Sequence, residues 1–311
     1  MGGRTVAIFT AHFDVTADAV IVELNRRAVP VFRCDPADYP AVVSLAAHFG
    51  VGWTGLLRAG ERTLDLADVA CAWWRRPGRS TVAPDVREFE WLEREASAGL
   101  RGVLSTLPWL NHPETIRAAE HKPCQIATAA QVGLRVPPTL VTNDPDAARV
   151  FAKAHGALIY KPLTGGILSD GTVIYASPVD MDTIDDGVRA TTHMFQPRIT
   201  KAYELRITVV GERLFVARID ANSEIGRQDW RADYQNLTYR SYSVPDHVAD
   251  KIHRFMREMR LRFAAIDMIV TPDGGHVFLE ANPNGQWAWI EDETGMPIAS
   301  AIADVLEGAT P

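Results

Sequence analysis

The sequence predicts an α/β protein with a parallel sheet near its start and an antiparallel hairpin near its end. Residues 5–10 form a short apolar run, residues 15–28 have helical spacing of their apolar positions, and residues 29–35 are apolar again. This β-α-β order is typical of a parallel sheet. Two later apolar runs, "IDMIVT" and "HVFLEA", flank the turn sequence "PDGG" and predict a β-hairpin.

Composition narrows the class of protein. The 311 residues, 47% of them hydrophobic and 23% charged, fit a globular chain of about two domains. A net charge of -7 argues against a nucleic-acid partner. No apolar run approaches the roughly 20 residues of a membrane span, so we expect no membrane partner. Cys34, Cys71 and Cys124 are far apart without a C-x-x-C motif, which predicts reduced thiols and a cytoplasmic protein.

The first half of the chain contains no dinucleotide fingerprint. Its first turn reads "TAHFDVT", without the G-x-G-x-x-G that such a site requires there. Residues 55–78 then read as strands and turns, and residues 84–107 as an amphipathic helix. We place a domain boundary within residues 108–115.

A lysine precedes the next helix. Lys122 stands at its start, Pro123 favours the first helical position, and Gly133 ends it. Strands, helices and hairpins follow, at residues 137–142, 143–156, 157–176, 195–199, 204–211, 213–220, 245–261 and 264–283.

A second lysine precedes a glycine-rich loop. Lys161 lies on the strand at residues 157–163, and residues 164–171 form the loop. Glycines permit close approach of a backbone to a ligand, but no G-K-[ST] follows them, so this is not a Walker A loop. An exposed lysine beside a flexible hairpin is the alternative.

The closing hairpin brings acidic side chains together. If its turn is centred within "PDGG", Ile269 faces Phe278 and Asp267 faces Glu280. Asn282 shares the face of Glu280, because side chains two apart in a strand point the same way. Opposed carboxylates, with Cβ atoms about 4.5–5.5 Å apart, repel each other.

A divalent cation would remove this repulsion. Two carboxylates and one amide, from Asp267, Glu280 and Asn282, suit Mg²⁺, which takes few protein ligands. The alternative is a surface hairpin with solvated acids, and a register slip of one residue would place the acids on opposite faces.

These residues carry a family resemblance. An Asp on one strand followed by E-x-N at the end of the next resembles the metal-binding core of ATP-grasp carboxylate–amine ligases. The segments "WWRRP", "HKPCQIATAAQVGLRVPPTLVTND", "KAYELRITVVGERLFVARID", "DWR" and "FLEANPNGQW" resemble the graspetide (microviridin-type) maturases, which macrocyclise ribosomal peptides. The resemblance implies an ATP-grasp fold with a pre-ATP-grasp domain at residues 1–112, a central lid at 113–190, and a C-terminal domain at 191–311.

The resemblance also implies ATP and two Mg²⁺ ions, and it gives roles to further residues. Lys122 and Lys161 would contact phosphates, with Gly165 and Gly166 closing over ATP. Backbone groups around Gln196 and Ile199 would bind adenine, and Glu204 would bind the ribose.

Arginines supply the remaining candidates. The resemblance implies that an arginine binds the γ-phosphate and the acyl phosphate, since a guanidinium suits developing negative charge. We rank Arg231 as the first candidate, Arg206 as the second and Arg218 as the third. Surface ion pairing is the alternative. Arg75 and Arg76 would form a patch for an acidic peptide, although a basic loop after a buried Trp pair is an alternative.

The activity implied is a two-step ligation. A substrate carboxylate becomes an acyl phosphate, and a Ser, Thr or Lys side chain of the same precursor peptide, with its leader and acidic core, closes a ring. Two alternatives stay open: a ligase resembling glutathione synthetase or the ribosomal-protein glutamate ligase, and a non-catalytic ATP-binding regulator. A homodimer also stays open.

Overall fold

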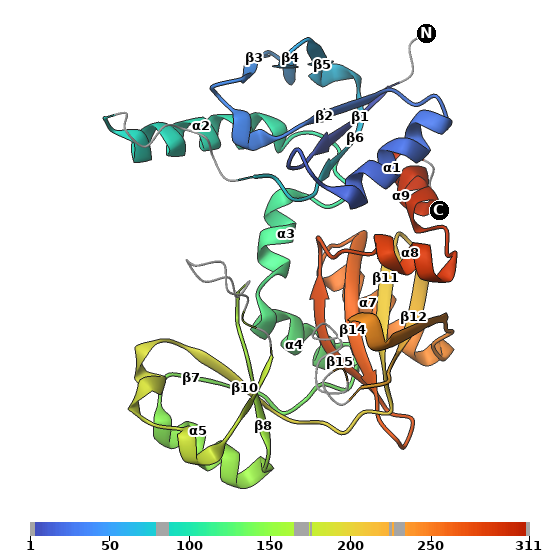
Figure 1. The fold of residues 1–311 in the computed structure, drawn as a ribbon. Coiled ribbons are helices and arrows are strands. Elements are labelled where there is room, and N and C mark those ends of the chain that lie inside the picture. The colour runs from blue at the N-terminus through green and yellow to red at the C-terminus, as the bar shows by residue number, and fades with distance from the viewer. Residues whose placement is uncertain are drawn as a thin grey trace.

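The structure is a computed structural model, and it describes residues 4–78, 87–164, 174, 176–223, 226 and 234–308. Three regions, each with its own sheet or sheets, follow one another along the chain (Figure 1). Short 3-10 helices connect some of their elements: η1 (Pro36–Asp38), η2 (Leu66–Asp68), η3 (Met181–Thr183), η4 (Asp186–Ala190) and η6 (Tyr234–Asn236).

The N-terminal region has the parallel sheet that the opening pattern predicts, in the order β2-β1-β6. Asp14 caps α1, because its carboxylate accepts a hydrogen bond from the Ala17 amide at 3.2 Å. A separate antiparallel sheet has the order β3-β4-β5. The elements are β1 (Thr5–Phe9), α1 (Val15–Arg26), β2 (Val31–Cys34), β3 (Val43–Phe49), β4 (Trp53–Ala59), β5 (Arg62–Asp65), β6 (Val69–Trp74) and α2 (Phe89–Leu104).

The central region is a four-stranded sheet in the order β7-β10-β8-β9, packed on α5. Its elements are β7 (Leu140–Thr142), α5 (Pro145–His155), β8 (Leu158–Lys161), β9 (Ser177–Val179) and β10 (His193–Pro197). We expected residues 191–311 to form one domain. However, β10 lies within that range and pairs with β7 and β8, so it belongs to the central sheet.

The C-terminal region is a five-stranded antiparallel sheet in the order β13-β12-β11-β14-β15. Its elements are β11 (Tyr203–Val210), β12 (Arg213–Ala221), β13 (Leu237–Ser241), α7 (Asp246–Glu258), β14 (Phe263–Val270), β15 (His276–Asn282), α8 (Ala288–Thr294) and α9 (Ile298–Leu306). Within the described residues, none of the helices has the length and apolar character needed to cross a membrane.

Two helices, α3 (Pro113–Ala119) and α4 (Lys122–Gln131), link the first region to the second. We assigned both to the lid at residues 113–190, but α4 packs on the C-terminal sheet. The Gln125 side chain bonds both backbone groups of Ala281, donating to its carbonyl at 2.7 Å and accepting from its amide at 2.9 Å. This contact covers the edge of β15 and fixes the start of α4 beside the end of that strand.

The two faces of the C-terminal sheet differ in polarity. Leu205, Ile207 and Val209 of β11 point into a core beneath α4 and α7. The alternate residues point the other way, and the last of them, Val210, is apolar. The other three are polar and buried: Glu204, Arg206 and Thr208. The second face of the sheet is therefore apolar at one end and polar at the other.

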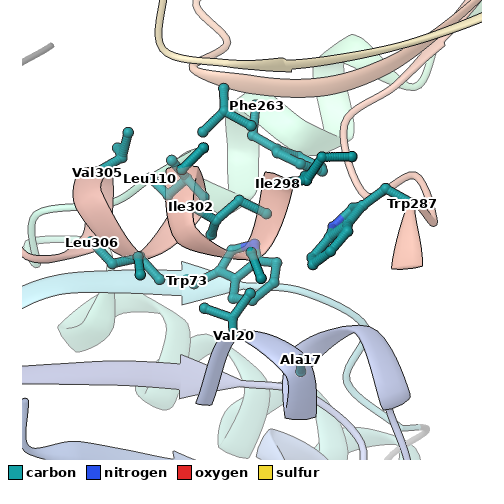
Figure 2. Close-up of a cluster of buried hydrophobic side chains, with 14 of the residues drawn as sticks. Ala17, Val20, Trp73, Leu110, Phe263, Trp287, Ile298, Ile302, Val305 and Leu306 are labelled. Carbon is teal, nitrogen blue, oxygen red and sulfur yellow. The ribbon is translucent and has the colours of Figure 1, made fainter. Parts of the chain in front are cut away.

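The apolar end belongs to a core that the N-terminal and C-terminal regions share. Val20 and Trp73 of the first region, Phe263 of β14 and Ile302 of α9 lie in one buried cluster, with α9 beside the N-terminal helix and sheet (Figure 2). Burial of this much apolar surface holds the two regions together. The polar end of the same sheet face therefore has a fixed position beside the N-terminal region.

Candidate active site

The closing hairpin places Asp267 opposite Glu280, as its turn sequence predicts. A bulge at Leu279 interrupts the register, however. On the turn side of the bulge, Phe278 pairs with Met268, so our predicted register is wrong there by one residue. Beyond the bulge the predicted register is correct, and the two carboxylates share the polar end of the sheet face.

Each of these carboxylates has a cationic partner. Arg206 Nη1 donates to Asp267 Oδ1 at 2.8 Å, and both side chains are only 6% exposed. Lys122 Nζ, at the start of α4, lies 3.0 Å from Glu280 Oε2. These cations offset the repulsion between the opposed carboxylates. The structure thus brings together two candidate metal ligands, a candidate phosphate lysine and a candidate catalytic arginine.

Asn282 completes the candidate metal site. It ends β15 two residues after Glu280, and its Oδ1 accepts a hydrogen bond from the Asn284 amide at 2.9 Å. An amide oxygen has a second lone pair for a metal. Among the described residues, no three His, Cys, Asp or Glu side chains cluster as a metal site. Two carboxylates and one amide nevertheless fit Mg²⁺, which completes its octahedron with water and phosphate oxygens.

A cavity of about 520 Å³ opens beyond Glu204, between β12 and the chain that joins β10 to β11. Its lining includes Arg198, Ile199, Lys201, Glu204 and Ile219. Lys201 Nζ lies 2.5 Å from Glu204 Oε1. We did not select Lys201 from the sequence, and its position three residues before Glu204 is the signal that could have identified it. Its charge makes it a further candidate for a phosphate or ribose contact.

The other nucleotide candidates differ in their relation to this cavity. Lys161 ends β8 and is 8% exposed. Ile199 lines the cavity, whereas Gln196 lies inside β10 and donates from Nε2 to Thr139 Oγ1 at 2.9 Å. The segment after β10, rather than Gln196 itself, is therefore open to a nucleotide.

A second cleft, of about 900 Å³, opens between the candidate metal residues and the N-terminal region. Arg206, Glu280 and Asn282 line it. Its rim includes Phe13, which is 96% exposed, and Arg76. The polar end of the sheet face therefore lies between two cavities, one near the central region and one near the N-terminal region.

Arg218 is not brought to this site. It pairs in register with Leu205, so it points to the opposite face of the sheet from Arg206. Its guanidinium bonds Asp220 at 2.6 Å and lies 3.6 Å above the Tyr203 ring. The remaining candidates, Arg231, Gly165 and Gly166, lie outside the described residues, and their roles stay predictions.

The two arginines that we predicted as one substrate patch differ in position. Arg76 is exposed, lines the 900 Å³ cleft, and donates from Nε to the Asn284 carbonyl at 3.2 Å. Arg75 is 0% exposed. Burial lowers the pKa of Arg75 to about 9, with Asp14 acting in the opposite direction, so the guanidinium stays charged near neutral pH. A bound peptide can therefore reach Arg76 but not Arg75.

Comparisons with known proteins give this site a context. Residues 5–117 match the family model described as the MvdD pre-ATP-grasp domain. A RiPP-associated ATP-grasp ligase of Chryseobacterium gregarium, solved with ADP and a leader and core peptide, is 28% identical with a TM-score of 0.90, and the match covers 99% of this chain and 98% of that chain.

Two macrocyclases of Microcystis aeruginosa MRC are also similar. MdnB is 31% identical with a TM-score of 0.81, over 97% of this chain and 99% of that chain. MdnC, bound with the precursor peptide MdnA, is 29% identical with a TM-score of 0.86, over 98% and 99%. A glutathione synthetase of Xanthomonas campestris is 28% identical over 187 residues, so the chain spans about half, 56%, of that relative's length.

Proposed function

The chain belongs to the peptide-modifying macrocyclase family of ATP-grasp ligases, and on that premise we propose that it closes ω-ester or ω-amide rings in a ribosomally made precursor peptide. The acyl donors would be Asp or Glu side chains of the precursor, activated as acyl phosphates. The proposed partner is a precursor peptide with a leader and an acidic core. In support, one similar ligase was solved with a leader and core peptide, and another with a precursor peptide.

One observation carries this proposal. Glu280 and Asn282 line the wider cleft beside Arg76, and Arg206 of the same cleft holds Asp267. Glu204, two residues before Arg206 on β11, lines the other cavity. A nucleotide in the cavity beside Glu204 and a peptide in the wider cleft would meet at the candidate metal residues. Such positioning of two reactants is the main source of catalysis in phosphoryl transfer.

The first proposed step activates the peptide. A peptide carboxylate attacks the γ-phosphorus of ATP, forms the C–O–P link of an acyl phosphate, and releases ADP. Asp267, Glu280 and Asn282 would hold Mg²⁺, which would supply positive charge next to the phosphate oxygens. Lys122, Lys161 and Arg231 would add positive charge around the phosphates. Arg206 holds Asp267 in place and presents its guanidinium to the wider cleft.

The second proposed step closes the ring. A hydroxyl or amine of the same peptide attacks the acyl carbon, phosphate leaves with the bonding electron pair, and the nucleophile's proton passes to phosphate or solvent. No protein nucleophile takes part. The exposed Arg76 would attract the acidic core. The cytoplasmic location and the homodimer stay predictions from the sequence.

The similarity to glutathione synthetase favours one second candidate, a ligase that acts on a small molecule or a protein tail. That enzyme would use the same activation step but would join two separate substrates. The match covers only 56% of that relative, whereas the macrocyclases match over nearly their whole length. A peptide that reacts with itself is therefore the better supported substrate.

Mass spectrometry tests the proposal. The chain, ATP, Mg²⁺ and a candidate acidic precursor are incubated together, and each ring formed removes one water from the precursor. We expect loss of water that depends on both ATP and Mg²⁺. Formation of an adduct with an added amino acid, without loss of water inside the precursor, would instead support the second candidate.

A further inference from the structure

Arg75 carries a charge into the interface between the N-terminal and C-terminal regions. It directly follows β6, and it is among the largest fully buried side chains in the described part of the chain. Its Cζ lies 5.8 Å from the centroid of the Trp73 ring. A buried charge is costly unless it is paired, so the partners of Arg75 indicate what the side chain does.

Those partners lie on both sides of the interface. Nη2 of Arg75 donates to Gln286 Oε1 at 2.7 Å, and Nη1 donates to the main-chain carbonyl of Asn284. Nε lies 3.5 Å from the Asp14 carboxylate, which caps α1. Arg75 thus ties the loop that follows Asn282 to the N-terminal region.

Gln286 extends this connection to a candidate metal carboxylate. Its main-chain carbonyl accepts a hydrogen bond from Arg206 Nη2 at 2.7 Å, while Arg206 Nη1 donates to Asp267 at 2.8 Å. The Gln286 side-chain oxygen also accepts a hydrogen bond from Thr16 in α1. One residue of the loop therefore joins Arg75, which follows β6, to Arg206 of β11.

We infer that Arg75 is a positioning residue for the metal site: it fixes the loop at residues 282–286 across the interface and, through Gln286, sets where Arg206 holds Asp267. This inference rests on the metal site of the proposed function. Lysine cannot take over the role, because Arg75 donates hydrogen bonds from two nitrogens of a planar fork to two residues of the loop, and lysine has one nitrogen. Mutation of a group that orients a metal ligand typically lowers metal affinity by about 10- to 100-fold.

Arg27 offers a matched control. It ties the same two regions together, through Nη1 to Asp304 Oδ1 at 2.6 Å and Nη2 to Ser300 Oγ at 2.7 Å. Both partners belong to α9 and neither is a candidate metal ligand. Loss of Arg27 therefore removes a polar anchor of the same kind without touching the loop after β15.

The test compares Arg75→Met, Arg75→Lys and Arg27→Met. Calorimetry measures the binding of AMPPNP at rising Mg²⁺ concentrations, and thermal unfolding gives the Tm. We expect all three variants to lower the Tm. Only the two Arg75 variants should raise the Mg²⁺ concentration at half-maximal nucleotide binding, by about tenfold or more, with Mg²⁺-free binding unchanged. A wild-type Mg²⁺ midpoint in folded Arg75→Met would overturn the inference.

A second variant, Gln286→Met, tests the same link in case Arg75→Met does not fold. Gln286→Met removes the side-chain link but keeps the carbonyl that Arg206 uses, and we expect a smaller shift in the same direction. Arg75→Met combined with Gln286→Met should shift the midpoint no further than Arg75→Met alone, because both act through one link. Additive shifts would contradict that link. Nucleotide binding by the wild type that ignores Mg²⁺ would overturn the proposed function as well, whereas normal dependence in every variant would overturn only this inference.

Discussion

The C-terminal region meets its two neighbours in different ways. Toward the N-terminal region it shares a continuous apolar core, in which Ile302 of α9 packs with Trp73 and Phe263 (Figure 2). The central sheet instead has its own core within the described residues, which includes Leu158 and Phe195. The interface with the N-terminal region therefore resembles the interior of one domain. The interface with the central region joins two regions that have separate cores (Figure 1).

The two kinds of interface suit the two substrate sites of the proposed reaction. Residues that must keep one geometry, Arg75, Gln286 and Arg206, lie at or next to the shared core. The cavity beside Glu204 lies near the second interface, where a body with its own core can move as a unit. We therefore expect nucleotide binding to displace the central region and to leave the metal residues in place.

Loss of a metal ligand should have the largest effect. Glu280→Gln keeps the shape of the side chain but removes its charge, so turnover should fall more than about 100-fold at saturating Mg²⁺. The Tm should change little, because the pair with Lys122 is partly exposed. Glu293→Gln, an acid in the same cleft on α8, is the control and should stay active. Near-normal turnover of Glu280→Gln would show that the metal assignment is wrong.

Cavities in the two cores should distinguish the interfaces. Ile302→Ala removes buried apolar volume from the shared core and should destabilise both outer regions together, by about 2–5 kcal/mol. Leu158→Ala should have an effect of similar size that is confined to the central region. Hydrogen exchange of the backbone amides separates the two cases. Unchanged protection of β1 in Ile302→Ala would mean that the outer regions do not unfold as one unit.

A side chain at Gly285 should disturb the fixed interface locally. An added Cβ would lie 2.3 Å from Ala265 Cβ and 2.9 Å from Arg206 Nη2. Gly285→Ala should therefore cost about 1–3 kcal/mol of stability and weaken Mg²⁺-dependent nucleotide binding. Gly99→Ala in α2 has open space around it and should stabilise the helix by up to about 1 kcal/mol. Chemical denaturation and calorimetry measure the two effects, and equal behaviour of the two variants would contradict the packing argument.

Charge reversal at the rim should act on the peptide. Arg76→Glu places a like charge beside an acidic core and should raise the KM for peptide by about tenfold, with nucleotide affinity unchanged. Steady-state kinetics with a precursor peptide measures the KM. Arg75 is buried, so Arg75→Glu would destabilise the fold and would not report on peptide binding. A change in ATP affinity with an unchanged peptide KM would place Arg76 on the nucleotide side.

The smallest predicted effect concerns pH. Burial lowers the pKa of His193 in β10, and neither ring nitrogen has a hydrogen-bond partner among the residues that the structure describes. The unfolded histidine takes up a proton near pH 6.5, while the folded one resists it, so the stability of the central region should fall as pH falls below about 6.5. His193→Gln should flatten this dependence in the central region alone. Urea unfolding followed by limited proteolysis, at about pH 7 and about pH 5, checks it; an equal flattening in the other regions would contradict a separate central unit.

Local patterns in the sequence predicted the parts of the site that lie close together in the chain. The turn sequence placed Asp267 opposite Glu280, and strand alternation placed Asn282 beside Glu280. The extra residue at Leu279 left no local signal, because an apolar residue fits a bulge as well as a regular strand.

Contacts between distant segments could not be predicted in this way. The burial of Arg75 depends on where the loop after β15 packs, and the pair of Lys122 with Glu280 depends on the docking of α4. The alternation of β11, with Glu204, Arg206 and Thr208 on one face, was a signal that the sequence did contain. Read with the strand period, it indicates a sheet face that changes from apolar to polar along its length.

The place of α9 in the shared core has a consequence for biosynthesis. This helix follows every other described element, yet it covers the apolar residues of α1, which is translated long before it (Figure 1). During translation, the apolar surface of α1 therefore stays exposed until α9 leaves the ribosome. We therefore expect nascent chains of this protein to bind chaperones. Removal of α9 alone would expose the apolar surface of α1, although the two helices lie far apart in the sequence.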